Sequence, residues 1–238
     1  MANIITRNIP NTITCCNLIS GCIAIHFAFL CQPATALLCI IIGAVFDFFD
    51  GMTARLLGVS SPIGKELDSL ADVITFGAAP ATMVFSLLHT IDYPTALEPA
   101  REVLPYTAYI IAAFSALRLA KFNLDERQAT SFIGLPTPAN ALFWGSLIVG
   151  AGNVITSSPG MLFVILALIL LSSYALVAEI PMFALKFKSW GWKGNELRYL
   201  FIISCFPLLI IFRTSGFAII IAWYIILSAI NNKHKSQN

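Results

Sequence analysis

Four aspartates between positions 47 and 72 have the spacing of a site that binds metal or moves protons. Asp47 and Asp50 are three residues apart, and Asp68 and Asp72 are four residues apart. On helices, both spacings place the two side chains on one face, a turn apart. Two such helices, joined by the short link around residues 58–64, would direct all four carboxylates toward one point.

Carboxylates this close repel one another, and burying them is costly unless a cation cancels their charge. A pair of divalent cations would cancel it. The available ligands are oxygen atoms, with no histidine or cysteine nearby in the sequence, and this donor set favours Mg²⁺ or Mn²⁺ over zinc. The pattern therefore predicts a site for two divalent cations held by Asp47, Asp50, Asp68 and Asp72.

The segments that must position these aspartates are strongly apolar. Of 238 residues, 58% are hydrophobic and 11% charged, and the mean hydropathy is +0.84. Soluble domains carry roughly 25% charged residues, so the composition indicates an integral membrane protein. The net charge of +2 argues against a nucleic-acid partner. The six cysteines have no metal or disulfide spacing, and we interpret them as core- or lipid-facing residues.

Eight apolar runs approach the roughly 20 residues that a transmembrane helix needs. Residues 1–10 are too polar to span and are expected to lie along the interface as a short amphipathic helix. The sequence thus predicts an all-α integral membrane fold, a single membrane domain (1–238) with about eight transmembrane helices. The last two runs suit a hairpin or a re-entrant pair, and whether both span fully stays open. The runs cover residues 11–31, 34–57, 67–90, 103–122, 136–156, 160–181, 197–212 and 214–231.

Basic residues indicate the orientation, because cytoplasmic loops are enriched in lysine and arginine. With the N-terminus inside, only Arg101 and Arg213 of the 14 basic residues fall on the outer side. The aspartates then lie at the cytoplasmic ends of the second and third helices, within reach of water-soluble substrates. The inner residues are Arg7, Arg55, Lys65, Arg118, Lys121, Arg127, Lys186, Lys188, Lys193, Arg198, Lys233 and Lys235.

The segment from Asp47 to Asp72 follows the pattern D-x2-D-G-x2-A-R-x8-G-x3-D-x3-D. This pattern resembles the signature of the CDP-alcohol phosphotransferases, integral membrane enzymes of phospholipid synthesis. Three later segments are similar to the membrane-embedded phosphatidylserine synthases within that family: Phe76–Ala81, an R-L-A-x-F-N run from Arg118 and a G-L-P-x-P run from Gly134.

The resemblance implies transfer of a phosphatidyl group from CDP-diacylglycerol to L-serine, with release of CMP and help from two divalent cations, Mg²⁺ or Mn²⁺. It also implies that Asp72 acts as the base for the serine hydroxyl while touching metal. It covers residues 8–150, the expected catalytic core, whereas residues 160–238 are expected to add helices without an assigned role. A homodimer in a bacterial inner or plasma membrane, with its active site facing the cytoplasm, is implied as well.

Substrate contacts follow from the same resemblance. Arg118 is expected to bind the serine carboxylate, with Lys121 (where arginine is commoner) and Asn123 assisting. These residues also suit a simpler role as membrane-interface anchors, and the Pro10–Thr14 segment also suits a capped helix start. The residues expected to contact the CDP-lipid are Asn11, Thr14, Gly51, Ala54, Arg55, Ser61 and Gly64.

Two alternatives stay open at this point. The acceptor could be another alcohol, such as glycerol 3-phosphate or inositol phosphate, which would call for extra basic residues around its phosphate. An ion-coupled transporter would also use intramembrane acids, although such proteins tend to show internal repeats and broken helices. The sequence does not decide the lipid backbone, the preferred metal, or direct displacement against a covalent intermediate.

Overall fold

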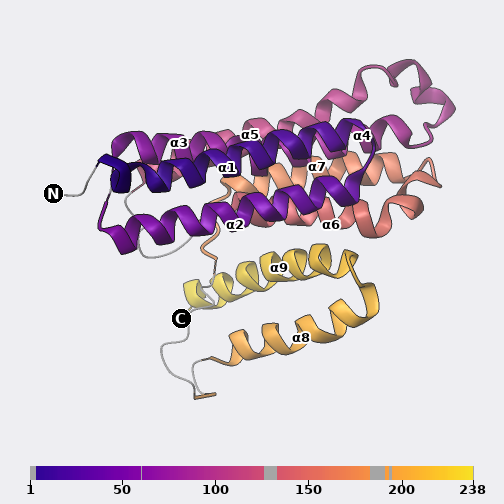
Figure 1. Cartoon of the computed structure of the whole chain (residues 1–238). Helices are drawn as coiled ribbons and strands as arrows, with labels where there is room; N and C mark the ends of the chain where they lie inside the picture. Colours follow the sequence, from indigo (N-terminus) through magenta and orange to yellow (C-terminus); the bar gives the residue numbers. More distant parts are fainter. Residues whose placement is uncertain (1–3, 60, 126–132, 183–190, 193–194, 238) are drawn as a thin grey trace.

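The computed structural model describes residues 4–59, 61–125, 133–182, 191–192 and 195–237, with only the backbone at 4–7 and 233–237. Its helices run back and forth along one direction and pack side by side (Figure 1). They are α1 (Ile4–Phe29), α2 (Pro33–Leu57), α3 (Pro62–Asp72), α4 (Ala79–Thr90), α5 (Ile110–Leu124), α6 (Thr137–Thr156), α7 (Met161–Val177), α8 (Glu196–Phe212) and α9 (Ser215–Gln237). A π-helix, η1 (Val73–Ala78), joins α3 to α4, and the 3₁₀-helices η2 (Thr95–Ala100) and η3 (Leu104–Tyr109) precede α5.

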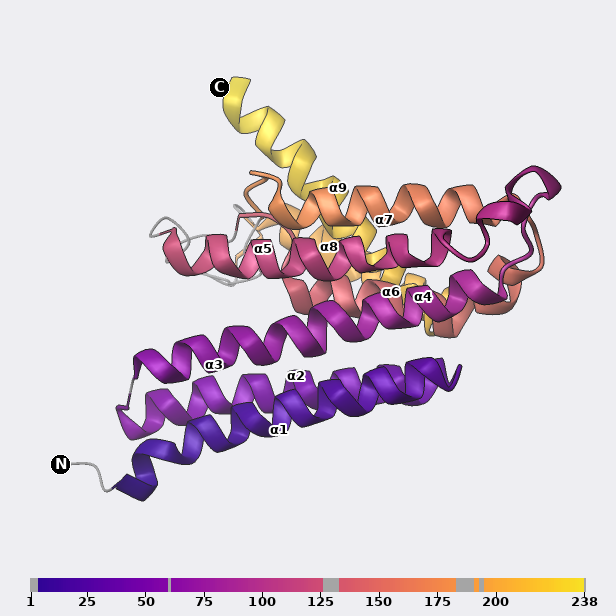
Figure 2. The same cartoon turned by 90° about the horizontal axis from the view of Figure 1, so that it is seen from above.

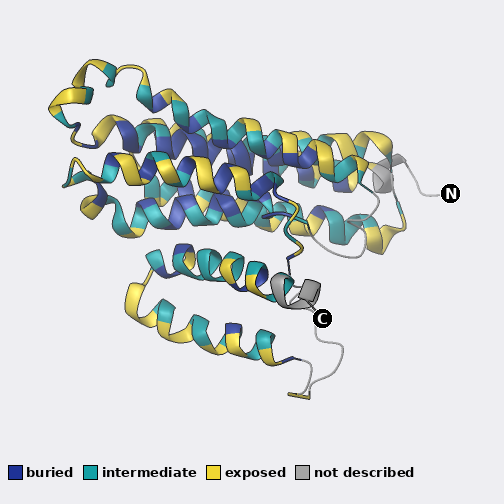
Figure 3. Ribbon diagram, turned by 180° about the vertical axis from the view of Figure 1, so that it is seen from behind, coloured by how far each residue is buried: buried dark blue, intermediate teal, exposed yellow. Residues whose placement is uncertain are grey.

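The predicted all-α membrane fold is confirmed. Each of the eight predicted apolar runs contains a helix. Large apolar residues such as Phe48, Leu170 and Ile210 are exposed, and Figure 3 shows exposed positions recurring along the helices. The helices α5, α7 and α8 have only 15, 17 and 17 residues. Five stretches of the described chain are long and apolar enough to cross a membrane: Asn8–Phe29, Pro33–Leu57, Pro62–Thr90, Thr137–Thr156 and Ser215–Asn232.

Two details at the N-terminal side differ from the expectation. The described part of the predicted N-terminal helix, residues 4–10, is not separate, because α1 begins at Ile4 and continues through Pro10 to Phe29. The third helix begins at Pro62 rather than near residue 67. A proline is well tolerated in the first helical turn, where its missing N–H would have no partner, so the polar start of this segment still joins the helix.

The turn between α2 and α3 is short because its residues cap both helices. Gly58 ends α2 in the left-handed region, with φ of 62°, a conformation that costs glycine little. Ser61 then caps α3, as its Oγ accepts a hydrogen bond from the Gly64 N–H at 3.0 Å. The chain therefore reverses direction within a few residues. The sequence predicted such a short link between the two helices that carry the aspartates.

The N-terminal helices meet at a close contact around Thr75 in η1. A Cβ at Gly21 of α1 would clash with Thr75 Oγ1 and lie 2.8 Å from Thr75 Cα. A Cβ at Gly43 of α2 would lie 2.5 Å from Thr75 Cγ2. Glycine at both positions lets α1 and α2 approach η1 closely, and this packing was not predicted from the sequence.

The C-terminal helices α8 and α9 form a hairpin beside the other helices, one of the two arrangements that the sequence left open. Helix α9 packs on α6, and α8 lies on the outside, mainly against α9 (Figures 1 and 2). The contact between α6 and α9 is close at one point, where a Cβ on Gly150 would lie 2.5 Å from Ser215 N.

The described basic residues separate between the two ends of the bundle. Arg55, Lys65 and Lys121 lie near helix termini at the end that holds the α2–α3 turn, whereas Arg101 and Arg213 lie at the opposite end (Figure 1). This separation matches the predicted asymmetry. The side chains of Arg7, Arg127, Lys186, Lys188, Lys193, Lys233 and Lys235 lie outside the described residues.

Candidate active site

Three of the four predicted aspartates form a compact cluster between α2 and α3. Each of Asp47, Asp50 and Asp68 offers a carboxylate oxygen, and these oxygens lie within 4.8 Å of one another. Asp72 lies one turn further along α3, outside this group, and only 8% of its surface is exposed. It still interacts electrostatically with Asp47 and Asp68, so all four acids share one region.

Helix α1 holds one member of each acid pair. Thr14 Oγ1 donates a hydrogen bond of 2.6 Å to Asp50 Oδ2, and Asn17 Nδ2 donates one of 3.2 Å to Asp72 Oδ1. Thr14 and Asn17 are three residues apart, so both lie on the same face of α1. Asn17 in turn accepts a hydrogen bond at its backbone oxygen from Thr75 Oγ1, at 3.0 Å, which links the π-helix to Asp72.

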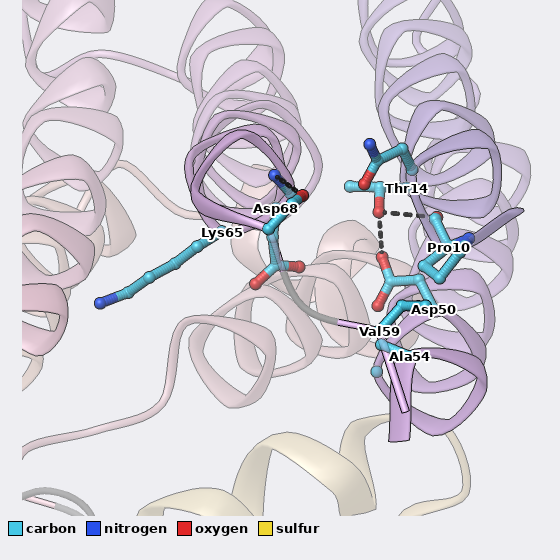
Figure 4. Close-up of a pocket in the computed structure, with 11 residues that line it drawn as sticks. Pro10, Thr14, Asp50, Ala54, Val59, Lys65 and Asp68 are labelled. Atoms are coloured by element: carbon cyan, nitrogen blue, oxygen red, sulfur yellow. Dashed lines mark hydrogen bonds between the residues drawn. The ribbon is translucent and has the colours of Figure 1, made fainter. Parts of the chain in front are cut away.

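A cavity of about 230 Å³ opens beside the cluster, and we call it the acidic cavity. Figure 4 shows Asp50 and Asp68 on facing walls, with Lys65 extending away. Six of the seven residues expected to contact the CDP-lipid line it; Arg55 does not, and its side chain is exposed in the last turn of α2. The lining residues are Pro10, Asn11, Thr14, Asp50, Gly51, Ala54, Val59, Ser61, Gly64, Lys65 and Asp68.

The two glycines of the motif differ in their surroundings. A Cβ at Gly51 would meet no atom within 4 Å, so this glycine keeps the acidic cavity wide. A Cβ at Gly64 would lie 2.9 Å from Asn11 Oδ1 and 3.0 Å from Ser61 Oγ. Gly64 therefore allows the polar side chains of α1 and the turn to approach α3.

A second cavity, of about 370 Å³, lies at the end of α5, and we call it the Arg118 cavity. Arg118 and Lys121 from α5 line it, together with Glu179 from the segment after α7. The Arg118 side chain is 7% exposed, lies over the Phe122 ring at 5.4 Å and has no partner for its Nε. Arg118 also interacts electrostatically with Asp72, which connects this cavity to the acids.

Asn123, the third residue expected to contact serine, does not line the Arg118 cavity. Its Nδ2 donates to Ser69 Oγ at 2.7 Å, and its backbone oxygen accepts from Lys65 Nζ at 3.1 Å. These bonds join the end of α5 to α3. The structure therefore brings together Arg118 and Lys121 of the predicted serine group, and separates Asn123 from them.

The donor set of the acid cluster fits hard divalent cations. Its ligand atoms are carboxylate oxygens, which Mg²⁺ and Mn²⁺ prefer. Among the described residues, no lysine or arginine forms an ion pair with Asp47, Asp50 or Asp68. The nearest candidates point elsewhere, since Lys65 bonds to Asn123 and Arg55 is exposed. Divalent cations from solution would cancel this charge.

Several characterised proteins are similar to this chain, and all are named CDP-diacylglycerol–serine O-phosphatidyltransferase. The protein from Bacillus subtilis is 41% identical over 131 residues, which are 55% of this chain and 69% of that protein. The one from Mycobacterium leprae is 35% identical over 142 residues, or 56% and 44% of the two lengths. The one from Methanocaldococcus jannaschii is 34% identical over 149 residues, or 63% and 62%.

The family model named CDP-alcohol phosphatidyltransferase matches residues 7–230, nearly the whole chain. The matched region includes the acid cluster, the α1 residues that hold it and the Arg118 cavity. With this match and the acid geometry together, the chain belongs to the CDP-alcohol phosphatidyltransferase family.

Proposed function

We propose that this protein transfers the phosphatidyl group of CDP-diacylglycerol to L-serine, giving phosphatidylserine and CMP. The observation that carries the proposal is the acid cluster beside the acidic cavity, together with Arg118, which lines the second cavity and interacts electrostatically with Asp72. The acidic cavity contains residues expected to contact the CDP-lipid, and the Arg118 cavity offers cations for a serine carboxylate. The names of the similar proteins support the same acceptor.

Each acid has a role in this reaction. Asp47, Asp50 and Asp68, with Asp72 at their edge, would hold two divalent cations, Mg²⁺ or Mn²⁺, and Thr14 fixes the orientation of Asp50. When bound, such cations polarise the diphosphate and neutralise charge on the leaving group. The residues of the acidic cavity hold the CDP group, so the phosphorus that carries the lipid faces the cluster.

Asp72 is the proposed base. The serine hydroxyl is a weak nucleophile and needs a proton acceptor. Asn17 donates to Asp72 Oδ1, which leaves Oδ2 to take the proton. The serine oxygen then forms its bond to the lipid-bearing phosphorus as the bond from that phosphorus to the CMP oxygen breaks. CMP leaves with the electron pair, and the proton stays on Asp72.

We also propose the orientation and assembly implied by the resemblance. The end of the bundle that holds the acids would face the cytoplasm, as its described basic residues favour, and two copies would form a homodimer. Serine and CMP would then enter and leave on the cytoplasmic side, while the lipid product stays in the membrane.

The test is an assay with purified protein, CDP-diacylglycerol, Mn²⁺ or Mg²⁺ and a panel of alcohols. We expect metal-dependent CMP release with L-serine and formation of phosphatidylserine. CMP release with glycerol 3-phosphate or inositol phosphate, and not with L-serine, would contradict serine as the acceptor. The absence of CMP release with every alcohol would favour the ion-coupled transporter.

Arg118 gives a sharper test of the acceptor pocket. We expect Arg118→Ala to raise the serine KM about ten- to a hundredfold, because a charge-assisted bidentate contact contributes about 1.5–3 kcal/mol. The KM for CDP-diacylglycerol should hardly change. Arg118→Lys should recover only part of the loss, since a point charge cannot reproduce the guanidinium fork.

The matched control is Arg101→Ala, at the opposite end of the bundle, where Arg101 pairs with Glu98 on the surface. It should leave both KM values unchanged. If Arg118→Ala raised the KM for CDP-diacylglycerol and left the serine KM unchanged, Arg118 would bind the diphosphate. That result would contradict its assignment to the serine carboxylate.

A further inference from the structure

The Arg118 cavity carries charges of both signs on different elements. Arg118 and Lys121 lie on α5. The acidic lining residues are Asp125, directly after α5, and Glu179, which follows α7. A phosphate in this cavity would meet like charges at the two acids, whereas a ligand that carries both a negative and a positive group would find an opposite charge for each.

Backbone hydrogen bonds hold Glu179 in the wall of this cavity. The Gly134 N–H donates to Ile180 O at 3.0 Å, and the Leu135 N–H donates to Ala175 O at 2.9 Å. Ile133 and Pro181 form an antiparallel bridge. Glu179 thus has one tied residue before it, Ala175, and two after it, Ile180 and Pro181. The segment that carries the glutamate is therefore tied on both sides to the chain between α5 and α6.

Glycine is required at position 134 for this arrangement. Gly134 has a φ of +77°, and a Cβ there would lie 2.6 Å from Leu176 O and 3.1 Å from Ala178 O. A side chain would push the segment around Gly134 away from the end of α7 and release the Glu179 segment. The G-L-P-x-P run thus holds the far wall of the Arg118 cavity.

We propose that Glu179 binds the ammonium group of the amino-acid acceptor, opposite Arg118, which binds its carboxylate. This assignment rests on the proposed serine transfer. An α-amino acid carries both charged groups on one carbon, and the two walls of the cavity offer one partner for each. The hydroxyl, one carbon further, then reaches toward Asp72, because Arg118 lies on the Asp72 side of the cavity.

The same wall selects against phosphorylated alcohols. A phosphate monoester carries about two negative charges at neutral pH. Inside the Arg118 cavity these charges would lie near Glu179 and Asp125, and like charges brought together at a binding surface weaken the complex. Glu179 therefore determines specificity as well as affinity: it favours a zwitterion over glycerol 3-phosphate or inositol phosphate.

The experiment compares Glu179→Gln with wild type, using L-serine as substrate and glycerate as competitor. Glycerate has the carboxylate and hydroxyl groups of serine but no ammonium group. We expect Glu179→Gln to raise the serine KM about ten- to a hundredfold, the scale of a lost charge-assisted hydrogen bond. Its kcat, its KM for CDP-diacylglycerol and its inhibition constant for glycerate should stay close to wild type. Arg118→Ala should raise the serine KM and the inhibition constant for glycerate by similar factors.

Two further variants make the assignment specific to this carboxylate. Glu179→Asp keeps the charge and should recover part of the serine affinity. Glu66→Gln removes an exposed glutamate of α3 that lines neither cavity, and it should match wild type.

An unchanged serine KM in Glu179→Gln, with active wild type, would overturn the assignment and leave the proposed function intact. A serine KM that rises in Asp125→Asn but not in Glu179→Gln would overturn the assignment as well, because it would place the ammonium site at Asp125. Wild-type protein that releases CMP only with acceptors lacking an ammonium group would overturn both proposals.

Discussion

At the scale of single residues, α1 donates one side-chain hydrogen bond to an aspartate of α2 and one to an aspartate of α3. Thr14 reaches Asp50 on α2, and Asn17 reaches Asp72 on α3. Neither donor carries a charge, so these bonds orient the carboxylates without neutralising them. The acids keep their affinity for cations and gain a fixed geometry, which a metal site requires.

Removing one acid should therefore remove the metal. We expect Asp68→Asn to weaken Mn²⁺ binding, followed by the electron paramagnetic resonance signal of free Mn²⁺. CMP release should fall at least about a hundredfold, the scale on which one lost electrostatic partner slows a reaction. The thermal unfolding temperature should not fall, because the substitution relieves repulsion among the acids.

A chelator should reproduce this loss in wild-type protein, and added Mn²⁺ or Mg²⁺ should restore wild type but not Asp68→Asn. Asp92→Asn is the matched control, since Asp92 is exposed at the opposite end of the bundle. Full activity of Asp68→Asn in metal-free buffer would contradict the proposed cation site.

At the scale of elements, the packing of η1 against α1 and α2 decides where Asp72 lies. Thr75 fits between Gly21 and Gly43 and bonds to the backbone of Asn17. Asn17 then bonds to Asp72. The position of the proposed base thus depends on how closely three helices approach one another.

Gly43→Ala should disturb this contact. Its Cβ would lie 2.5 Å from Thr75 Cγ2 and 3.0 Å from Asn17 Oδ1, and such overpacking costs about 1–3 kcal/mol. We expect a lower unfolding temperature in detergent and a reduced kcat. The double variant Gly43→Ala/Thr75→Ser lacks the clashing methyl group and should recover part of both.

Gly152→Ala on α6 is the control, because its Cβ would meet no atom within 4 Å. It should not lower stability, since alanine favours a helix more than glycine does, and it should leave activity unchanged. If Gly43→Ala behaved like Gly152→Ala, the close contact around Thr75 would not be needed to position Asp72.

Much of this arrangement could be predicted from the sequence, because spacing on a helix fixes which side chains share a face. The acid cluster was predicted in this way. The seven residues expected to contact the CDP-lipid were inferred from the family resemblance instead, and six of them line the acidic cavity. Spacing also explains why Asn123 lies apart from Arg118: five residues turn a helix by about 500°, which leaves the two side chains about 140° apart. Phe122, four residues after Arg118, lies on its face and contacts it.

Other features depend on contacts between distant segments, which a local pattern does not contain. Asn17 and Thr75 matter only because α1, α2 and η1 meet at two glycines. The place of Glu179 follows from backbone bonds to residues 134 and 135, more than forty positions earlier in the sequence. The prediction of a separate N-terminal helix was wrong, because polar residues can extend a helix whose apolar part is already fixed by packing.

At the scale of the whole molecule, the C-terminal hairpin contacts the segment after α7, which lines the Arg118 cavity. Asn232 in α9 donates from Nδ2 to Pro181 O at 3.0 Å. Leu135, Leu176 and Met182 form a small buried cluster, against which Tyr224 and Ile225 of α9 pack. The helices without a sequence motif thus support the segment that carries Glu179.

Asn232→Ala should loosen that segment. We expect a serine KM about two- to tenfold higher, in line with one lost hydrogen bond of about 0.5–1.5 kcal/mol, and an unchanged KM for CDP-diacylglycerol. Asn231→Ala, one position earlier, is the matched control and should have no effect. Equal serine KM values in the two variants would show that α9 does not act on the acceptor cavity.

The π-helix at Val73–Ala78 also determines where this bundle tolerates a change in length. A π-turn accommodates one residue more than an α-turn, so deleting one residue within it yields an ordinary α-helix that keeps both flanking halves in phase. The same deletion in α3 or α4 would rotate one half against the other by about 100°, turning either the aspartates or the buried face of α4 the wrong way. Single-residue length differences among relatives should therefore collect at this point of the helix, at the cost of the local geometry that places Thr75.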